Sequence, residues 1–194
     1  YRGPTPIQTT ILNGEKETGV TIIKIDEEAD HGLILESKKW EIESRIKFEE
    51  LSSALAELGA ELLIKILPDY LAGKIELRLQ DHSQATFTKK FARDDARINW
   101  NKTAEEIDCQ IRALNPEPGV WTIWNGRMLK ILEAGIISGE GRQNGQVFQE
   151  ENKIAVGTAK GLIVLKTIQL EGKKVILAED FARGNSDFIG AILE

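Results

Sequence analysis

The spacing of apolar residues in the first third of the chain predicts two helices and two strands. Residues 4–13 begin with proline, carry apolar residues on one side and end in Asn-Gly, which is typical of a short helix. The β-branched run at residues 20–25 predicts a buried strand, and residues 32–40 predict a second strand. Apolar residues then recur at helical spacing and predict a long helix that ends near residues 68–73: Phe48, Leu51, Leu55, Leu58, Leu62, Ile66 and Leu67.

The second half of the chain shows a different pattern, of short strands separated by turns. Residues 103–114 predict a helix, and a final helix is expected near residues 178–183. The Asn125-Gly126 pair between two apolar runs is a strong hairpin signal. Many short strands at regular spacing predict a small β-barrel. The predicted strands are residues 120–124, 129–137, 145–149, 153–158 and 162–170.

These elements divide the chain into three parts. Residues 1–73 predict part of an α/β domain, and residues 93–194 predict the β-barrel. Residues 74–92 lie between them. Up to Lys90 this segment is mostly polar and its apolar residues show neither helical nor strand periodicity, so we predict an inter-domain linker. A sheet of two strands is marginal alone in water, and a strand as apolar as residues 20–25 normally lies between neighbours and under helices. We therefore expect the first part to be an incomplete domain.

Composition narrows the classes of protein that fit. The net charge of −6 and the pI near 5.2 argue against binding nucleic acid by bulk electrostatics. The acidic excess is concentrated in residues 1–80, whereas residues 81–194 are nearly neutral. The single cysteine, Cys109, cannot form an internal disulfide, and the chain has neither a signal-peptide pattern nor an apolar run long enough for a membrane span. These features predict a cytoplasmic protein that makes no membrane contact.

Two groups of motifs carry a family resemblance that covers nearly the whole chain. The blocks Tyr1-Arg2-Gly3-Pro4-Thr5-Pro6, Glu17-Thr18-Gly19-Val20-Thr21 and residues 25–32 resemble, in order and spacing, the 10-formyltetrahydrofolate-dependent formyltransferases. Ala96-Arg97-Ile98-Asn99-Trp100 and residues 111–119, which contain Asn-Pro-x-Pro-Gly, resemble the carboxy-terminal domain of the methionyl-tRNA formyltransferase family. The resemblance implies the carboxy-terminal part of a Rossmann-like formyltransferase domain, followed by a β-barrel like the oligonucleotide/oligosaccharide-binding (OB) fold.

Asp30 is the residue to which the resemblance assigns catalysis. Formyl transfer to an amine needs a proton to leave the amine and an oxyanion to be stabilised, and a carboxylate held in a turn can relay that proton. In the family an Asn and a His share this work with the Asp, and both lie upstream of the Tyr-Arg-Gly stretch that opens this chain. His31 follows the Asp and does not replace that His. We therefore expect the 194-residue chain alone to be inactive and its missing amino-terminal portion to be a partner.

The resemblance also implies binding residues, with 10-formyltetrahydrofolate as co-substrate and no metal. Folate-binding candidates are Glu28, Ala29, His31 and Gly32, and substrate-binding candidates are Arg2 and Gly3. The candidate phosphate contacts to initiator methionyl-tRNA are Lys89, Lys90, Arg93, Arg97, Arg112 and Arg183.

Simpler roles remain open for several of these residues. Arg97 and Arg112 can instead pair with carboxylates on nearby acidic residues: Asp94, Asp95 and Asp108. The aromatic residues Trp100, Trp121 and Trp124 are expected in the barrel core rather than as platforms for bases. Cys109 lies between apolar helix positions, which predicts packing rather than a nucleophile.

The resemblance thus implies the larger, carboxy-terminal portion of a methionyl-tRNA formyltransferase, which is expected to be a monomer when intact. One alternative is a tRNA-binding module with an inactive catalytic stub. Another is a sugar-nucleotide N-formyltransferase, which shares the amino-terminal blocks but is not expected to carry the Arg-Ile-Asn-Trp and Asn-Pro pattern.

Overall fold

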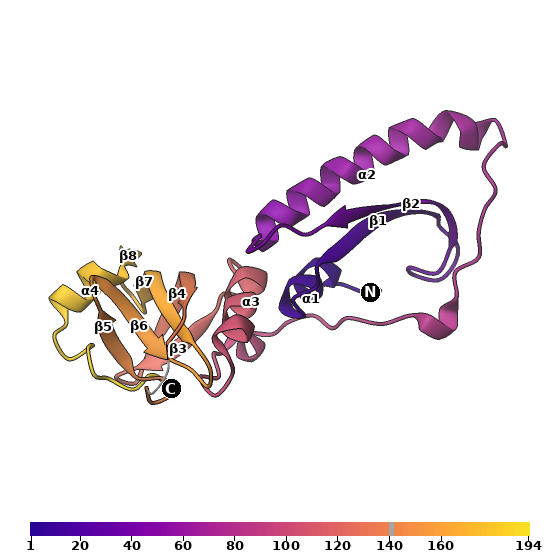
Figure 1. The fold of residues 1–194 in the computed structure, drawn as a ribbon. Helices are drawn as coiled ribbons and strands as arrows, with labels where there is room; N and C mark the ends of the chain where they lie inside the picture. The colour runs from indigo at the N-terminus through magenta and orange to yellow at the C-terminus, as the bar shows by residue number, and fades with distance from the viewer. Residues whose placement is uncertain (140–141) are drawn as a thin grey trace. The chain divides into compact units, whose positions relative to one another are not determined.

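The computed structural model describes residues 1–139 and 142–194, which form two compact units, Tyr1–Lys90 and Phe91–Glu194 (Figure 1). The boundary between them lies within the segment predicted as a linker. No helix in the described part of the chain combines the length and the apolar character needed to cross a membrane.

The first unit has the predicted order of helix, strand, strand and helix. Its elements are α1 (Pro6–Leu12), β1 (Glu17–Lys24), β2 (Leu33–Glu41) and α2 (Phe48–Leu71). The two strands form an antiparallel hairpin that runs from the Glu17–Glu41 pair to the Lys24–Leu33 pair, with a bulge at Ile22/Ile23. Glu50 caps the N-terminus of α2, because its side chain accepts a hydrogen bond from the Lys47 backbone N–H at 2.8 Å.

Helix α2 lies along the β1–β2 hairpin and covers one face of it (Figure 1). Leu35 of β2 packs there against Leu62 and Ile66 of α2. The prediction that residues 20–25 are a buried strand is wrong, because no side chain of β1 is fully buried and Ile25 is 84% exposed. The physical reason is that this sheet has two strands and α2 shields only one of its faces.

Residues 74–90, which we call the strap, contain one short 3₁₀ helix, η1 (His82–Gln84), and are otherwise irregular, but they are not a free linker segment. Ile34 of β2 and Arg78 exchange backbone hydrogen bonds at 2.8 and 3.0 Å. Further along, the Arg2 N–H donates to the Thr86 carbonyl at 2.7 Å, and the Thr88 N–H donates to the Arg2 carbonyl at 2.8 Å. The strap therefore joins β2 to the amino-terminal segment within the first unit.

The second unit is built on a curled antiparallel sheet. Its elements are η2, a 3₁₀ helix (Arg93–Ala96), α3 (Ala104–Leu114), β3 (Trp121–Trp124), β4 (Arg127–Ile137), β5 (Val147–Glu150), β6 (Lys153–Gly157), β7 (Leu162–Leu170), β8 (Ile176–Leu177) and α4 (Ala178–Gly184). The strand order is β3-β4-β7-β6-β5, and β8 pairs with β7. The short strand β8 was not predicted from the sequence, whereas the Asn125-Gly126 hairpin between β3 and β4 is confirmed.

The two edge strands of this sheet, β3 and β5, are not paired with each other in the part of the chain that the structure describes. A tail formed by residues 190–194 hydrogen-bonds to both edges instead. Ile123 of β3 exchanges backbone bonds with Glu194, while the Val147 N–H of β5 donates to the Ala191 carbonyl. The sheet is thus curled, with the tail between its edges, rather than shown as a closed barrel.

The tryptophans predicted for the core of this unit are buried, as expected. Trp100 is 5% exposed, and its Nε1 donates to Thr122 Oγ1 at 3.0 Å. Trp124 packs edge-on against Phe181 and Phe188, with ring centroids 5.2 and 5.4 Å away. Trp121 is 8% exposed, so all three indoles serve the core of the unit.

Candidate functional site

The acidic loop, residues 26–31, connects β1 to β2 at the tip of the hairpin. Its last turn is tight, because Asp30 adopts a left-handed φ of 57°. Gly32 comes next, and a Cβ at that position would lie 1.8 Å from the Lys24 carbonyl oxygen. Only glycine allows the two backbones to approach this closely. The loop conformation therefore depends on the Asp-x-Gly sequence.

The carboxylate of Asp30 is held by the amino-terminal turn. The Gly3 backbone N–H donates to Asp30 Oδ2 at 2.9 Å, across 27 residues of sequence. Gly3 has a φ of +104°, and a Cβ there would meet the Thr88 carbonyl oxygen at 2.9 Å. Since both glycines are required by backbone geometry, the turn and the acidic loop form one preorganised site. The structure thus brings together the catalytic candidate Asp30 and the substrate candidates Arg2 and Gly3.

Arg2 lies beside this carboxylate but does not pair with it. Its Nη2 donates to Gln80 Oε1 at 2.6 Å and to His82 Nδ1 at 3.0 Å, so that His82 accepts through that nitrogen. Gln80 Nε2 in turn donates to the backbone carbonyls of Asp30 at 3.2 Å and Gly32 at 2.7 Å. Sequence reasoning missed Gln80, because it lies in a segment without period that predicted only a linker.

His31 faces the acidic loop and the strap rather than the Asp30 carboxylate. Its Nδ1 donates to Asp26 Oδ2 at 2.7 Å, and this hydrogen bond holds the pKa of the Asp26 carboxyl below its usual range. Its ring stacks on His82 with centroids 4.0 Å apart and planes 6° apart. In the strap, hydrogen bonds from Ser83 likewise lower the pKa of Asp81. The two histidines thus fasten the loop to the strap.

An open cavity of about 540 Å³ lies next to Asp30. Ile23, Ile34 and Leu79 give it apolar walls, and Arg2 and Gln80 line its polar side. A cavity of this size suits a small organic ligand, with its few polar groups fixing orientation. Glu28, Ala29, His31 and Gly32, the predicted folate contacts, lie in the acidic loop or directly after it, but none of them lines this cavity.

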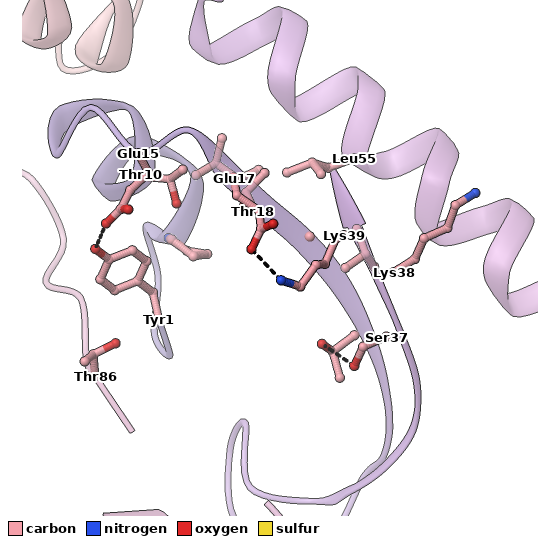
Figure 2. Close-up of a pocket in the computed structure, with 15 residues that line it drawn as sticks. Tyr1, Thr10, Glu15, Glu17, Thr18, Ser37, Lys38, Lys39, Leu55 and Thr86 are labelled. Atoms are coloured by element: carbon pink, nitrogen blue, oxygen red, sulfur yellow. Dashed lines mark hydrogen bonds and ion pairs between the residues drawn. The ribbon is translucent and has the colours of Figure 1, made fainter. Parts of the chain in front are cut away.

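A second cavity, of about 800 Å³, opens along β1 and the first turn of α1 (Figure 2). Figure 2 shows the Tyr1 hydroxyl pointing to Glu15, to which it donates at 2.8 Å, and Lys39 paired with Glu17 at 2.7 Å. The hydrogen bond to Glu15 raises the pKa of the Tyr1 phenol. Tyr1, Pro6, Thr21 and Thr86 line both cavities, so the two are adjacent. In the described residues, no group of three His, Cys, Asp or Glu side chains could hold a metal ion.

The basic residues predicted to contact tRNA occupy different environments. Lys89 and Lys90 are exposed at the end of the first unit. Arg93 and Arg97 lie over the Trp121 ring, with guanidinium carbons 6.0 and 5.4 Å from its centroid. Arg183 is exposed and pairs with Asp180.

Arg112 differs from the other basic candidates, since its side chain is only 14% exposed. Its Nε donates to buried Asp108 at 2.8 Å, which is one of the pairings left open by the sequence. Its Nη2 also contacts Cys109 Sγ at 3.1 Å. Burial raises the pKa of the Cys109 thiol, which agrees with the predicted packing role.

Comparison with known proteins agrees with this architecture. Residues 1–67 match the formyl transferase family, and residues 90–186 match the formyl transferase C-terminal domain. The methionyl-tRNA formyltransferase of Roseiflexus sp. (strain RS-1) is 39% identical over 186 residues, which are 95% of this chain and 57% of the relative. That of Rickettsia rickettsii (strain Iowa) is 36% identical over 195 residues, covering 100% of this chain and 63% of the relative. The chain therefore spans about three fifths of the length of these relatives.

Solved structures show the same fold. HypX from Aquifex aeolicus, in complex with tetrahydrofolic acid, superposes with a TM-score of 0.73 at 18% identity over 96% of this chain and 33% of HypX. An N-formyltransferase from Helicobacter canadensis, in complex with folinic acid and dTDP-3-aminofucose, gives 0.66 at 26% identity over 85% of this chain and 61% of that enzyme. Together with the two domain matches, these findings show that the chain belongs to the formyl transferase family, and that it joins part of the formyl transferase domain to the family's C-terminal domain.

Proposed function

We propose that the full-length protein transfers the formyl group of 10-formyltetrahydrofolate to the amino group of methionine on initiator tRNA. The observation that carries the proposal is the hydrogen bond from Gly3 to Asp30, which fixes a carboxylate at the wall of the 540 Å³ cavity. Relatives named methionyl-tRNA formyltransferase, which match 95% or more of this chain, support the choice of substrate.

In this proposal, Asp30 manages protons during the transfer. The amine nitrogen forms a bond to the formyl carbon, the bond from that carbon to N10 of the folate breaks, the amine loses a proton and N10 gains one. A carboxylate in a preorganised turn can accept that proton or orient an imidazole that accepts it. The Asn and His expected to share this work have no match in the chain. We therefore propose that the 194 residues alone do not turn over.

The cavity beside Asp30 fits the co-substrate in its chemistry. Its apolar walls, Ile23, Ile34 and Leu79, suit the faces of an aromatic heterocycle, and the polar residues that line the cavity offer hydrogen bonds to its edges. We propose that Glu28, Ala29, His31 and Gly32 contact the part of the folate that extends beyond this cavity, and that Arg2 and Gly3 contact the acceptor substrate.

The carboxy-terminal domain is proposed to hold the tRNA backbone. Phosphate contacts are expected from exposed basic side chains at the end of the first unit and in the second: Lys89, Lys90, Arg93, Arg97 and Arg183. Arg112 completes the predicted set, although its ion pair with Asp108 gives it a second role in the fold.

A sugar N-formyltransferase is the second candidate, because the Helicobacter canadensis enzyme shares the fold over 85% of this chain. The test offers the full-length protein 10-formyltetrahydrofolate with either methionyl-tRNA or dTDP-3-aminofucose and measures formylated product by mass spectrometry. Turnover of methionyl-tRNA with no sugar product supports the proposal. Turnover of the amino sugar alone would replace it with the second candidate, and tRNA binding without turnover of either acceptor would leave a binding module.

A further inference from the structure

Gln80 has no role in the proposed chemistry, although it hydrogen-bonds residues on both sides of the candidate site. It lies in the strap, half-buried, between two places where the strap is hydrogen-bonded to the rest of the first unit. Two residues before it, Arg78 pairs with Ile34 of β2, and six residues after it, Thr86 accepts from the Arg2 N–H. The backbone on either side of Gln80 is therefore held by hydrogen bonds, which fixes the position from which the Gln80 side chain extends.

The side-chain amide of Gln80 makes three hydrogen bonds, to both halves of the site. Its Nε2 donates to the carbonyls of Asp30 and Gly32, and its Oε1 accepts from Arg2. An amide supplies two donors and an acceptor in one plane, whereas an ionised carboxylate has no donor, and a thioether has no donor and is only a weak acceptor. No other residue named around Asp30 contacts the backbone on both sides of His31.

The backbone at Asp30 needs such a partner. A φ of 57° is sparsely populated for a residue with a Cβ, and such conformations persist where the surroundings over-determine them. The Gln80 amide holds the carbonyls of Asp30 and Gly32, on either side of His31, so rotation of Asp30 to a negative φ would break these hydrogen bonds. Were it to rotate, the carboxylate would leave the Gly3 N–H.

We propose that Gln80 is a positioning residue for formyl transfer: its amide locks the left-handed turn at Asp30 and thereby sets the direction of the catalytic carboxylate. The inference rests on the proposed function, since positioning matters only where Asp30 takes part in the reaction. Gln80 itself touches no reacting atom and acts through Asp30.

The test is a double-mutant cycle in the full-length enzyme, with kcat and KM measured for methionyl-tRNA and 10-formyltetrahydrofolate. Gln80→Met removes all three hydrogen bonds at similar length, and Gln80→Glu keeps only the acceptor for Arg2. Both are expected to lower kcat about 10- to 100-fold, because small displacements of a reacting group have effects of this order. Since Gln80 also lines the cavity proposed for the folate, a rise in the KM for the folate with unchanged kcat would assign Gln80 to binding and overturn the positioning role. In the Asp30→Asn background neither variant should lower kcat further.

Gln169→Met is the matched control, since Gln169 also donates to a backbone carbonyl, that of Lys173, but on β7 of the second unit. It should leave kcat unchanged. A second readout is hydrogen exchange at the Gly3 amide, which should become faster in Gln80→Met and Gln80→Glu and stay as in wild type in Gln169→Met.

The outcomes separate the two proposals. If Asp30→Asn lowers kcat but the Gln80 variants do not, or if their losses multiply with that of Asp30→Asn, the positioning role is overturned and the proposed function stands. If Asp30→Asn itself retains wild-type kcat, then the catalytic role of Asp30 and the positioning role of Gln80 fail together.

Discussion

The backbone N–H of Gly3 and the carboxylate of Asp30 lie 2.9 Å apart, donor to acceptor, although 27 residues separate them in the chain. The contact depends on two unusual backbone conformations, a φ of +104° at Gly3 and of 57° at Asp30. It fixes a charged group at the wall of a cavity without an ion pair, so that the carboxylate stays available to a substrate.

Replacing Asp30 by Asn in the full-length enzyme should lower kcat by about 100-fold, the scale typical of a lost acid–base group. Asn keeps the shape and an acceptor for the Gly3 N–H but cannot take up a proton. Because Asp30 is exposed, thermal unfolding should shift little. Steady-state kinetics and calorimetry check both statements, and a variant with wild-type kcat would remove Asp30 from the mechanism.

Gly32→Ala should destabilise the first unit by about 3 kcal/mol, because a methyl group there would overlap the Lys24 carbonyl and force the hairpin apart. Gly184→Ala is the control. Apart from its chain neighbours and the backbone of its own helix, no atom lies within 4 Å of the methyl group it would add, so its effect should stay within about 0.5 kcal/mol. Urea unfolding followed by circular dichroism measures both changes. Equal effects of the two substitutions would contradict the close approach at Gly32.

The Asp26–His31 contact should make a pH-dependent contribution to stability. Its hydrogen bond lowers the pKa of folded Asp26 below the unfolded value of about 3.9. Between these two pKa values the unfolded state holds more protons, so the contribution is complete above the unfolded pKa and is lost as the pH falls through the folded one. An NMR titration of the Asp26 carboxyl should give a midpoint below about 3.9 in wild type. The midpoint should rise in His31→Ala, and an unchanged midpoint would exclude the hydrogen bond as the cause.

Lys90→Ala should weaken tRNA binding by one phosphate contact. The log–log salt slope should fall by about 0.7 to 0.9, and the KM for tRNA should rise with little effect on the folate. Lys174→Ala is a control of the same charge outside the proposed contact set. Filter binding over a range of salt concentrations measures the slope. If Lys90→Ala leaves the slope and the KM unchanged, the tRNA surface lies elsewhere.

Leu193→Ala should destabilise the second unit by about 2–4 kcal/mol, although it lies next to the end of the chain. Leu193 is 3% exposed, and its N–H donates to the Gly145 carbonyl, which holds the tail against the β5 edge. Ile192 is the control, because its side chain is 42% exposed and Ile192→Ala should cost less than about 1 kcal/mol. Denaturant midpoints that are equal for the two variants would show that the tail is not part of the core.

The amino-acid sequence by itself determined the elements whose signals are local. The apolar stripe of α2, the strands β4 and β7 and the Asn125-Gly126 hairpin all follow from periodicity and turn chemistry, and the structure has them where the pattern predicts. These features depend on neighbours a few residues away, which a sequence displays directly. Arg2, Gly3 and Asp30 were instead indicated by the family resemblance, and the fold brings them together across 27 residues.

Only the tertiary structure decided the role of Gln80, the exposure of β1 and the partner of Arg112. Gln80 contacts residues 48 to 78 positions away in the chain. Its own segment has no hydrophobic periodicity, so the local pattern does not distinguish it from a linker residue. The exposure of β1 depends on how many faces of the hairpin other elements cover, which its own apolar residues do not specify. For Arg112, Asp108 lies four residues away, whereas Asp94 and Asp95 lie much further along the chain. Helical spacing places Asp108 within reach, but only the folded structure shows that this pair forms, with both side chains largely shielded from solvent.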